Sequence, residues 1–416
     1  MKGKEYFKQR LSDIYEFSLI DYLSGEGSLQ LENSDIHVKW ELCVDVSGQM
    51  LLIISCNKSL QTSQGTKFNR FNINGTSYDE DWKIECEDVI LYSKSYRWNG
   101  SNELYTYFGS PDLINLYIKK FQGKVDRVKA YISNFNFIGL EFSDYEDGSN
   151  LDKFDCKIQT KTFTFRLLQA SKKLIELIQV ARIPNAVLST VSVPILAYED
   201  FENSLKELNS LCWFISFLSL NTCFSPMTEM FFNDKLVQIR LDKRIALPFC
   251  RESLIDNLKI DAGIIIFLEQ YYEKYLELER NLDFNTVVSQ LLELQNIFHI
   301  EVKFATLIMA YEYLLSRFLV DKGITEEKML NYNIQQKLGK ANKYLKFIPA
   351  NSGDYLRDSI RNPLFHQGSL PFLSLTDKLQ EFDTYYELLI KIILKVLGYQ
   401  GKYISRINYH VVDLSQ

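Results

Sequence analysis

The spacing of apolar residues changes along this chain, and that change constrains the fold more than any other feature of the sequence. From about Leu29 to Phe165 the apolar residues form short, partly alternating runs broken by Gly, Asn, Asp and Ser, which predicts strands. From about Ile260 onward they recur at helical spacing. We therefore expect an α+β protein, in which a β-rich, sandwich-like N-terminal domain is followed by an all-α helical bundle. The β-rich part could be a β-sandwich or a rolled antiparallel sheet.

Short strands with turn residues between them are expected throughout the first part of the chain. The candidates are Ile36–Val44, Met50–Ser55, Trp82–Cys86, Val89–Tyr92, Leu104–Phe108, Arg127–Ile132, Phe137–Phe142 and Thr160–Phe165. The dipeptides Asn74-Gly75 and Asn99-Gly100 are typical of tight turns. One helix is expected in this part, from Asp112 to Lys120.

A helical period begins near Leu168 and continues to Ile178, and nearby prolines end regular structure before residue 200. The expected domains are a β-rich sensing or regulatory domain (1–198), a connecting segment (199–255) and a helical domain (256–416). The connecting segment should hold a helix at Ser204–Leu220 and a strand at Leu236–Leu241. The helical domain should hold helices at Ala262–Glu279, Asn285–Val320 (one helix or two), Thr325–Phe347, Gly353 to about Asn362, and Thr376–Leu397.

Composition narrows the class of protein. No run reaches the roughly 18 apolar residues of a membrane span, and the N-terminus lacks the apolar run of a secretory signal. Seven widely spaced cysteines without a C-x-x-C pair signal neither a disulfide framework nor a zinc site. No nucleotide-binding loop or cluster of metal-binding carboxylates is present. We expect a soluble cytoplasmic protein with no metal, no cofactor and no membrane association.

One short segment, Ser359–Gly368, places an arginine, a side-chain amide and a histidine close together: Arg361, Asn362 and His366. These residue types suit cleavage of a phosphodiester bond in RNA, where the 2′-hydroxyl is the nucleophile. Histidine can move protons near neutral pH, and arginine offers a fork of donors to phosphate oxygens. Asn362 can donate to the phosphate or orient the histidine.

The geometry of this segment predicts that one copy is half of a site. In a regular α-helix, Arg361 and His366 would lie about 140° apart. Pro363 disfavours helical geometry at the preceding residue and removes a donor, so we expect the helix to stop or kink inside the segment. A single histidine cannot easily act as base and acid together, and two copies in a symmetric dimer would supply both groups.

The pattern Arg361-Asn362-x-x-x-His366 at the end of an all-helical domain resembles the signature of HEPN-domain ribonucleases. The β-rich N-terminal part makes the chain similar to the ApeA-like branch of bacterial anti-phage HEPN proteins. The resemblance covers roughly 256–416. It implies a metal-independent endoribonuclease that leaves 2′,3′-cyclic phosphate and 5′-hydroxyl ends, and a homodimer formed through the helical domain. Arg361, Asn362 and His366 would be catalytic, with Glu312 on an upstream helix in a supporting role.

Local charge favours RNA as the partner. The net charge of −6 excludes a globally basic nucleic-acid binder, whereas the stretch from Lys328 to His366 carries a net +5. The residues expected to hold the backbone of a tRNA or mRNA are Lys337, Lys340, Lys343, Lys346 and Arg357. The resemblance to ApeA-like proteins further implies a role in anti-phage defence or growth arrest, in which a trigger from phage or from a partner protein would act on the N-terminal domain.

Two other interpretations of the sequence stay open. The helical domain could be a non-catalytic scaffold that dimerises while the N-terminal domain binds a partner protein, and Arg361 and His366 would then be a structural pair. The β-rich domain could instead bind a polysaccharide or small ligand, with the helices as an oligomerisation tail. The scaffold predicts an inaccessible His366, and the third interpretation predicts an aromatic cleft on the sheet.

Overall fold

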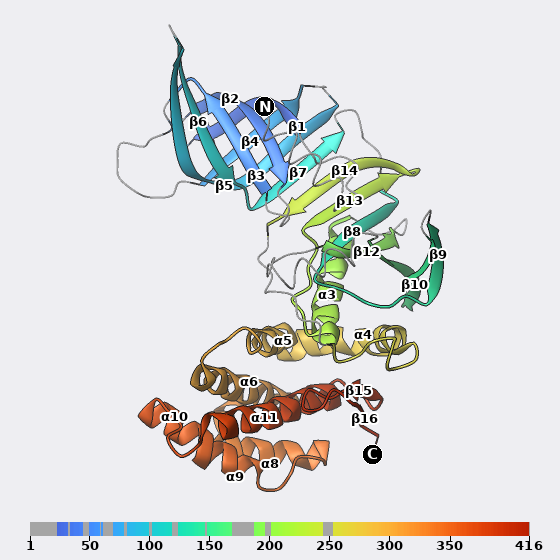
Figure 1. Cartoon of the computed structure of the whole chain (residues 1–416), viewed down its shortest axis with the longest axis vertical. Coiled ribbons are helices and arrows are strands. Elements are labelled where there is room, and N and C mark those ends of the chain that lie inside the picture. Colours follow the sequence, from blue (N-terminus) through green and yellow to red (C-terminus); the bar gives the residue numbers. More distant parts are fainter. Residues whose placement is uncertain are drawn as a thin grey trace. The chain divides into compact units, whose positions relative to one another are not determined.

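The computed structural model is a mixed α+β protein with a β-rich N-terminal region and a helical C-terminal region (Figure 1). It describes residues 23–31, 34–44, 50–58, 60, 70–78, 81–99, 102–118, 124–145, 148–168, 187–195, 201–243 and 253–415. The described residues form two compact units. One lies within Met1–Asp155, Thr160–Cys212 and Cys223–Phe249, and the other within Cys156–Gln159, Trp213–Thr222 and Cys250–Gln416. The predicted α+β class is confirmed.

Six strands of the N-terminal unit close on themselves. They are β1 (Leu23–Leu31), β2 (Ser34–Val44), β3 (Met50–Cys56), β6 (Asn102–Ser110), β5 (Trp82–Asn99) and β4 (Arg70–Ser77). Neighbours in this order pair antiparallel, and β4 pairs with both β1 and β5, which closes the ring. Alternate residues face a buried core that includes Trp40, Ile54 and Ile73. The strands thus form a closed, rolled antiparallel sheet, which is one of the two predicted arrangements, and not the two facing sheets of a sandwich.

The remaining strands of this unit extend the same sheet from β5, in the order β7, β14, β13, β8, β12, β11, β10, β9. Their bounds are β7 Leu113–Ile118, β8 Arg127–Ser133, β9 Glu141–Tyr145, β10 Gly148–Ile158, β11 Lys161–Leu167, β12 Val187–Pro194, β13 Met227–Phe232 and β14 Lys235–Asp242. The predicted strand at Leu236–Leu241 is therefore confirmed. Helix α3 (Phe201–Ser219), predicted at Ser204–Leu220, begins in this unit and ends in the helical one.

Several local predictions in the β-rich region were wrong. Within Asp112–Lys120, which was predicted as a helix, Leu113–Ile118 form strand β7, because pairing with β5 on one side and β14 on the other outweighs the helical spacing. Asn74-Gly75 lies inside β4, where a Cβ on Gly75 would come within 2.4 Å of the Trp40 Nε1. Trp82–Cys86 and Val89–Tyr92 belong to one strand, and regular structure in Phe137–Phe142 begins only at Glu141. Gly100 and the helix expected after Leu168 lie outside the described residues.

The second unit is built from helices. They are α4 (Gly263–Leu282), α5 (Phe284–Glu293), α6 (Ile300–Asp321), α7 (Glu326–Leu330), α8 (Ile334–Leu345), α9 (Ser352–Tyr355), the π-helix η1 (Leu356–Arg361), α10 (Asn362–Gln367) and α11 (Leu375–Val396). A small hairpin follows, formed by β15 (Lys402–Ile404) and β16 (Val411–Asp413). The segments predicted as Asn285–Val320 and Thr325–Phe347 each hold two helices.

Helix α6 lies at the centre of this unit because one of its faces is apolar throughout. Phe304, Ile308, Tyr311, Leu315 and Phe318 are all buried, as the helical period predicted. Against α11, the Phe304 ring meets the Phe382 ring edge-on, and the Tyr311 hydroxyl donates to the Tyr385 carbonyl at 2.6 Å. Because α6 is fixed in this way, the polar residues on its other side are held in defined positions.

Among the described residues, no helix is both long enough and apolar enough to cross a lipid bilayer.

Candidate active site

The Ser359–Gly368 segment lies in one continuous helical stretch. The backbone stays in the right-handed helical region at Arg361 and Asn362, so the helix does not stop at Pro363 as one form of the prediction held. It widens instead, because the Asn362 N–H donates to the Arg357 carbonyl five residues back, which is π-helical geometry. A proline has no N–H and its ring crowds the preceding turn, and the wider turn relieves that crowding. Such π-turns are frequent at functional sites.

The helix ends immediately after His366. Gly368 takes up a left-handed conformation (φ 71°) and its N–H donates to the Leu364 carbonyl, which closes α10 after Gln367. His366 is exposed in this last turn, and no hydrogen bond or ion pair of its ring is found among the described residues. The ring is therefore open to a ligand, as general acid–base chemistry requires. The inaccessible histidine expected of a scaffold is not observed.

Glu312 on α6 holds the arginine of the segment. The Arg361 Nε donates to the Glu312 Oε1 at 2.9 Å, and the two side chains are 36% and 32% exposed. The guanidinium also lies over the Phe365 ring, 5.5 Å from its centroid. Glu312, which was expected in a supporting role, is thus the residue that fixes Arg361. Its bond uses Nε, and among the described residues no hydrogen bond or ion pair of the terminal guanidinium nitrogens is found, so they can donate to an anionic ligand.

Lys337 lies beside this pair and is the buried member of the predicted lysine row. Its residue exposure is 8%, and burial lowers the pKa of its ammonium group, an effect that Glu312 opposes and Arg361 reinforces. Two cations and one carboxylate therefore act on one another here, and the cluster keeps a net positive charge. The other lysines of the row lie at the surface: Lys340 over the Tyr332 ring at 4.5 Å, and Lys343 and Lys346 exposed.

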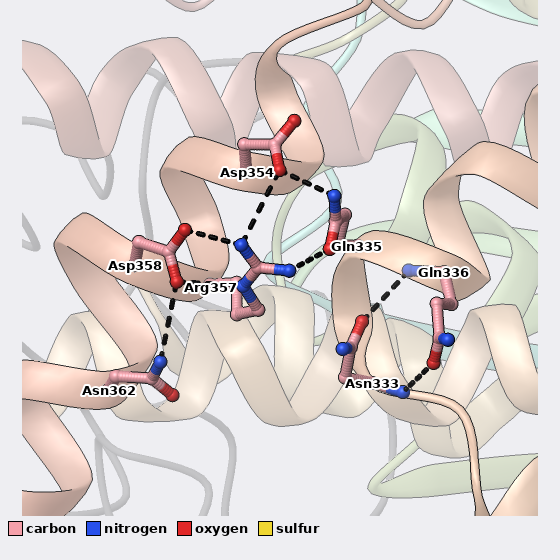
Figure 2. Close-up of polar contacts among 7 residues, drawn as sticks. All are labelled: Asn333, Gln335, Gln336, Asp354, Arg357, Asp358 and Asn362. Atoms are coloured by element: carbon pink, nitrogen blue, oxygen red, sulfur yellow. Dashed lines mark hydrogen bonds and ion pairs between the residues drawn. The ribbon is translucent and has the colours of Figure 1, made fainter.

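Arg357 is surrounded by acceptors, as Figure 2 shows. Its guanidinium donates to both carboxylate oxygens of Asp358 (2.7 and 2.5 Å) and to the Gln335 side chain, and it pairs with Asp354 at 3.6 Å. The Gln335 amide donates to Asp354 at 2.5 Å. The hydrogen bond to Arg357 lowers the pKa of Asp358. The Arg357 guanidinium, which the sequence assigned to RNA binding, is therefore already engaged by groups of the protein itself.

The same network reaches Asn362. Its side-chain amide donates to Asp358 Oδ1 at 3.5 Å, four residues back along the helix, so the carbonyl end of the side chain is left as a free acceptor (Figure 2). Gln335 is fixed in turn at the start of α8, where Asn333 and Gln336 form a capping box. A chain of hydrogen bonds thus runs from the beginning of α8 to Asn362.

The structure brings together most of the predicted site residues and adds two. Arg361, Glu312 and Lys337 form one cluster, and Asn362 is tied to Arg357 through Asp358. Asp358 could have been found from its i, i+4 spacing to Asn362. Gln335 could not, because it is distant in sequence and carries no charge. Among the described residues, no group of three or more His, Cys, Asp or Glu side chains is placed to hold a metal ion.

Comparison of the chain with protein-family models, with curated proteins and with solved structures found no match.

Proposed function

We propose that this chain is a metal-independent endoribonuclease whose catalytic residues are Arg361, Asn362 and His366. The observation that carries the proposal is the pairing of Arg361 with Glu312 in the same helical segment that ends with an exposed His366. A fixed arginine can stabilise the charge on the phosphate during 2′-hydroxyl attack, and an accessible histidine can carry out one of the two proton transfers. The resemblance of Arg361-Asn362-x-x-x-His366 to HEPN-domain ribonucleases supports the same chemistry.

In this reaction the 2′-oxygen of the substrate forms a bond to phosphorus, and the bond to the 5′-oxygen of the next nucleotide breaks. The products are a 2′,3′-cyclic phosphate and a 5′-hydroxyl. His366 takes the proton from the attacking hydroxyl or gives one to the leaving oxygen, and Arg361 stabilises the charge that builds up on the phosphate. Neither step requires a metal ion or a cofactor.

We further propose that the protein acts as a homodimer formed through its helical domain, so that two His366 side chains divide the two proton transfers. Apolar side chains left exposed within or shortly after the site in sequence support this arrangement. They are Phe365 (53% exposed), Phe372 (85%), Leu375 (66%) and Leu379 (48%). Exposed apolar residues that gather in one patch mark surfaces that associate with another chain.

In the cell, such an enzyme would cut tRNA or mRNA in the bacterial cytoplasm as part of anti-phage defence or growth arrest. The β-rich domain would receive the trigger, derived from phage or from a partner protein.

Purified protein and its variants test the proposal. Arg361→Ala and His366→Ala should abolish cleavage of total RNA and relieve any growth arrest on expression. The matched controls Arg280→Ala and His299→Ala change exposed residues of the same types elsewhere in the helical unit and should behave like the parent. If Arg361→Ala and His366→Ala cut RNA as well as the parent, the proposal is wrong, and a scaffold role becomes the better account.

A further inference from the structure

The sequence of helix α8 and its flanks carries basic residues and no acidic ones. Residues 331–353 contain four lysines and no Asp or Glu, in a chain whose net charge is −6. Lys340, Lys343 and Lys346 form no ion pair within the described ranges. A solvated helix face normally mixes both signs of charge, whereas a helix face with lysines alone attracts an anionic polymer.

Two tyrosines lie among these lysines. Tyr344 is 49% exposed, and its ring meets the buried Phe318 ring edge-on at 6.0 Å, so it is anchored on one side while much of its surface stays free. Tyr332 is covered by the Lys340 ammonium group at 4.5 Å. Aromatic rings interleaved with lysines form the surfaces on which proteins bind single-stranded nucleic acid, since each base can stack on a ring while lysines hold the backbone.

This surface lies on the same helix as Lys337, which belongs to the candidate active site. Lys337 and Tyr344 are seven residues apart, about 20° short of two full turns, so they project from the same side of α8. Lys337 lies beside Glu312 and Arg361, which are the charged groups that perturb its pKa. Tyr344 then follows about 10 Å further along the helix axis. A strand lying along α8 would therefore pass from Tyr344 to Arg361.

We propose that the side of α8 carrying Lys340 and Tyr344 binds single-stranded RNA next to the cleavage site, with a base stacked on Tyr344 and a phosphate on Lys340. The inference deepens the proposed ribonuclease function and rests on it. It assigns the substrate class: an unpaired strand, because the bases of a duplex are already stacked on one another and cannot reach an exposed ring. Recognition by stacking also predicts little dependence on base sequence.

The test is a binding titration with His366→Ala protein, which keeps the α8 surface and should not cut the probe. The probe is a fluorescent, unstructured single-stranded RNA of about 12 nucleotides, within the usual site size for such surfaces. Tyr344→Ala in this background should weaken binding about 5- to 150-fold, the range that corresponds to one stacked base. Tyr344→Phe should bind as tightly as His366→Ala alone, because stacking needs the ring and not the hydroxyl.

The matched control is Tyr409→Ala, which removes another tyrosine of similar exposure (47%) from the helical unit and should leave binding unchanged. Replacing one nucleotide of the probe by 2-aminopurine gives a second readout, since stacking on Tyr344 should quench its fluorescence even if Tyr344→Ala is poorly folded. The same strand in a duplex should show no dependence on Tyr344.

Three results would overturn the inference. One is unchanged binding by Tyr344→Ala, and another is equal loss in Tyr344→Phe. The third is binding of an acidic peptide, poly-glutamate, with the same dependence on Tyr344, which would assign the surface to a protein partner. The ribonuclease proposal can fail on its own. If the parent does not cut RNA but binds it in a way that depends on the Tyr344 ring, the RNA-binding inference is supported and the proposed cleavage activity is wrong. Conversely, His366→Ala could lose cleavage while Tyr344→Ala cuts and binds RNA as the parent does. The ribonuclease proposal would then stand, and the inference about Tyr344 would be wrong.

Discussion

The Arg361 Nε donates to the Glu312 Oε1 at 2.9 Å, which joins the π-helical turn to α6 across 49 residues of sequence. Each side chain keeps about a third of its surface exposed (36% and 32%), so this ion pair contributes on the order of 0–1 kcal/mol to stability. Its consequence is geometric. Together with the Phe365 ring, it fixes the direction of the Arg361 guanidinium.

Glu312→Ala should therefore lower RNA cleavage more than it lowers stability. Without its acceptor, Arg361 loses its orientation, and its repulsion with Lys337 is no longer offset by a carboxylate. We expect cleavage to fall about tenfold, equivalent to about 1.4 kcal/mol of lost transition-state stabilisation, while the melting temperature moves by only a few degrees. Glu301→Ala is the control. Glu301 lies on α6, as Glu312 does, but its ion pair (2.8 Å) is with Lys378 on α11 and does not involve a residue of the site. Equal effects of the two variants would contradict a positioning role for Glu312.

Burial of Lys337 should make the free energy of unfolding depend on pH. Because burial lowers the pKa of this lysine from its ordinary value of 10.5, the folded chain holds the proton less tightly than the unfolded chain. Below the lowered pKa both states are protonated and the burial cost is fully present. As the pH rises through the lowered pKa towards 10.5, the unfolded state binds more protons and this cost is relieved.

Lys337→Met should thus be more stable than the parent at pH 7, and this advantage should shrink as the pH approaches 10.5. Thermal unfolding at several pH values measures the difference, with the exposed Lys343→Met as control. An advantage that grew with pH would contradict this account of Lys337.

Pro363 favours the π-turn, and we expect its replacement to lower RNA cleavage without lowering stability. Pro363→Ala restores an N–H donor and removes the ring, so a regular α-turn becomes accessible and the melting temperature should rise or stay constant. In a regular α-helix, the Arg361 side chain would be rotated about the helix axis relative to His366 by up to roughly 100°, the rotation of one residue. Cleavage should therefore fall although the fold is at least as stable. Full activity in Pro363→Ala would show that the wide turn has no catalytic role.

The period of apolar residues was sufficient to predict the α+β class and the apolar face of α6, because burial of one helix face leaves a regular trace in sequence. It failed at Asp112–Lys120, since pairing with two neighbouring strands is a non-local effect that no short window contains. At the site, Arg361, Asn362 and His366 were found from chemistry and spacing. The inward position of Lys337 was not, because it depends on how α8 packs against α6 and η1.

The positive charge of Arg357 is paired within the protein, and we therefore expect it to contribute less to RNA binding than an unpaired lysine. The sequence assigns it to RNA binding, but its guanidinium is shared by Asp354, Asp358 and Gln335. Arg357→Ala should therefore change the slope of log affinity against log salt for single-stranded RNA by less than Lys340→Ala, for which we expect a change of about 0.7. Salt titrations of the two variants in the His366→Ala background give both slopes. A larger change for Arg357→Ala would restore it as a phosphate contact.

The chemistry assigned to His366 and Arg361 is tested most directly by a single 2′-deoxy substitution in the RNA substrate. Parent protein in the presence of EDTA is given an oligonucleotide with one mapped cleavage position, and the same oligonucleotide with the 2′-hydroxyl removed at that nucleotide. We predict a 2′,3′-cyclic phosphate product from the first and no cleavage at that position of the second, because the nucleophile is missing. Cleavage of the deoxy substrate at the same bond, or loss of all activity in EDTA, would contradict the proposed mechanism.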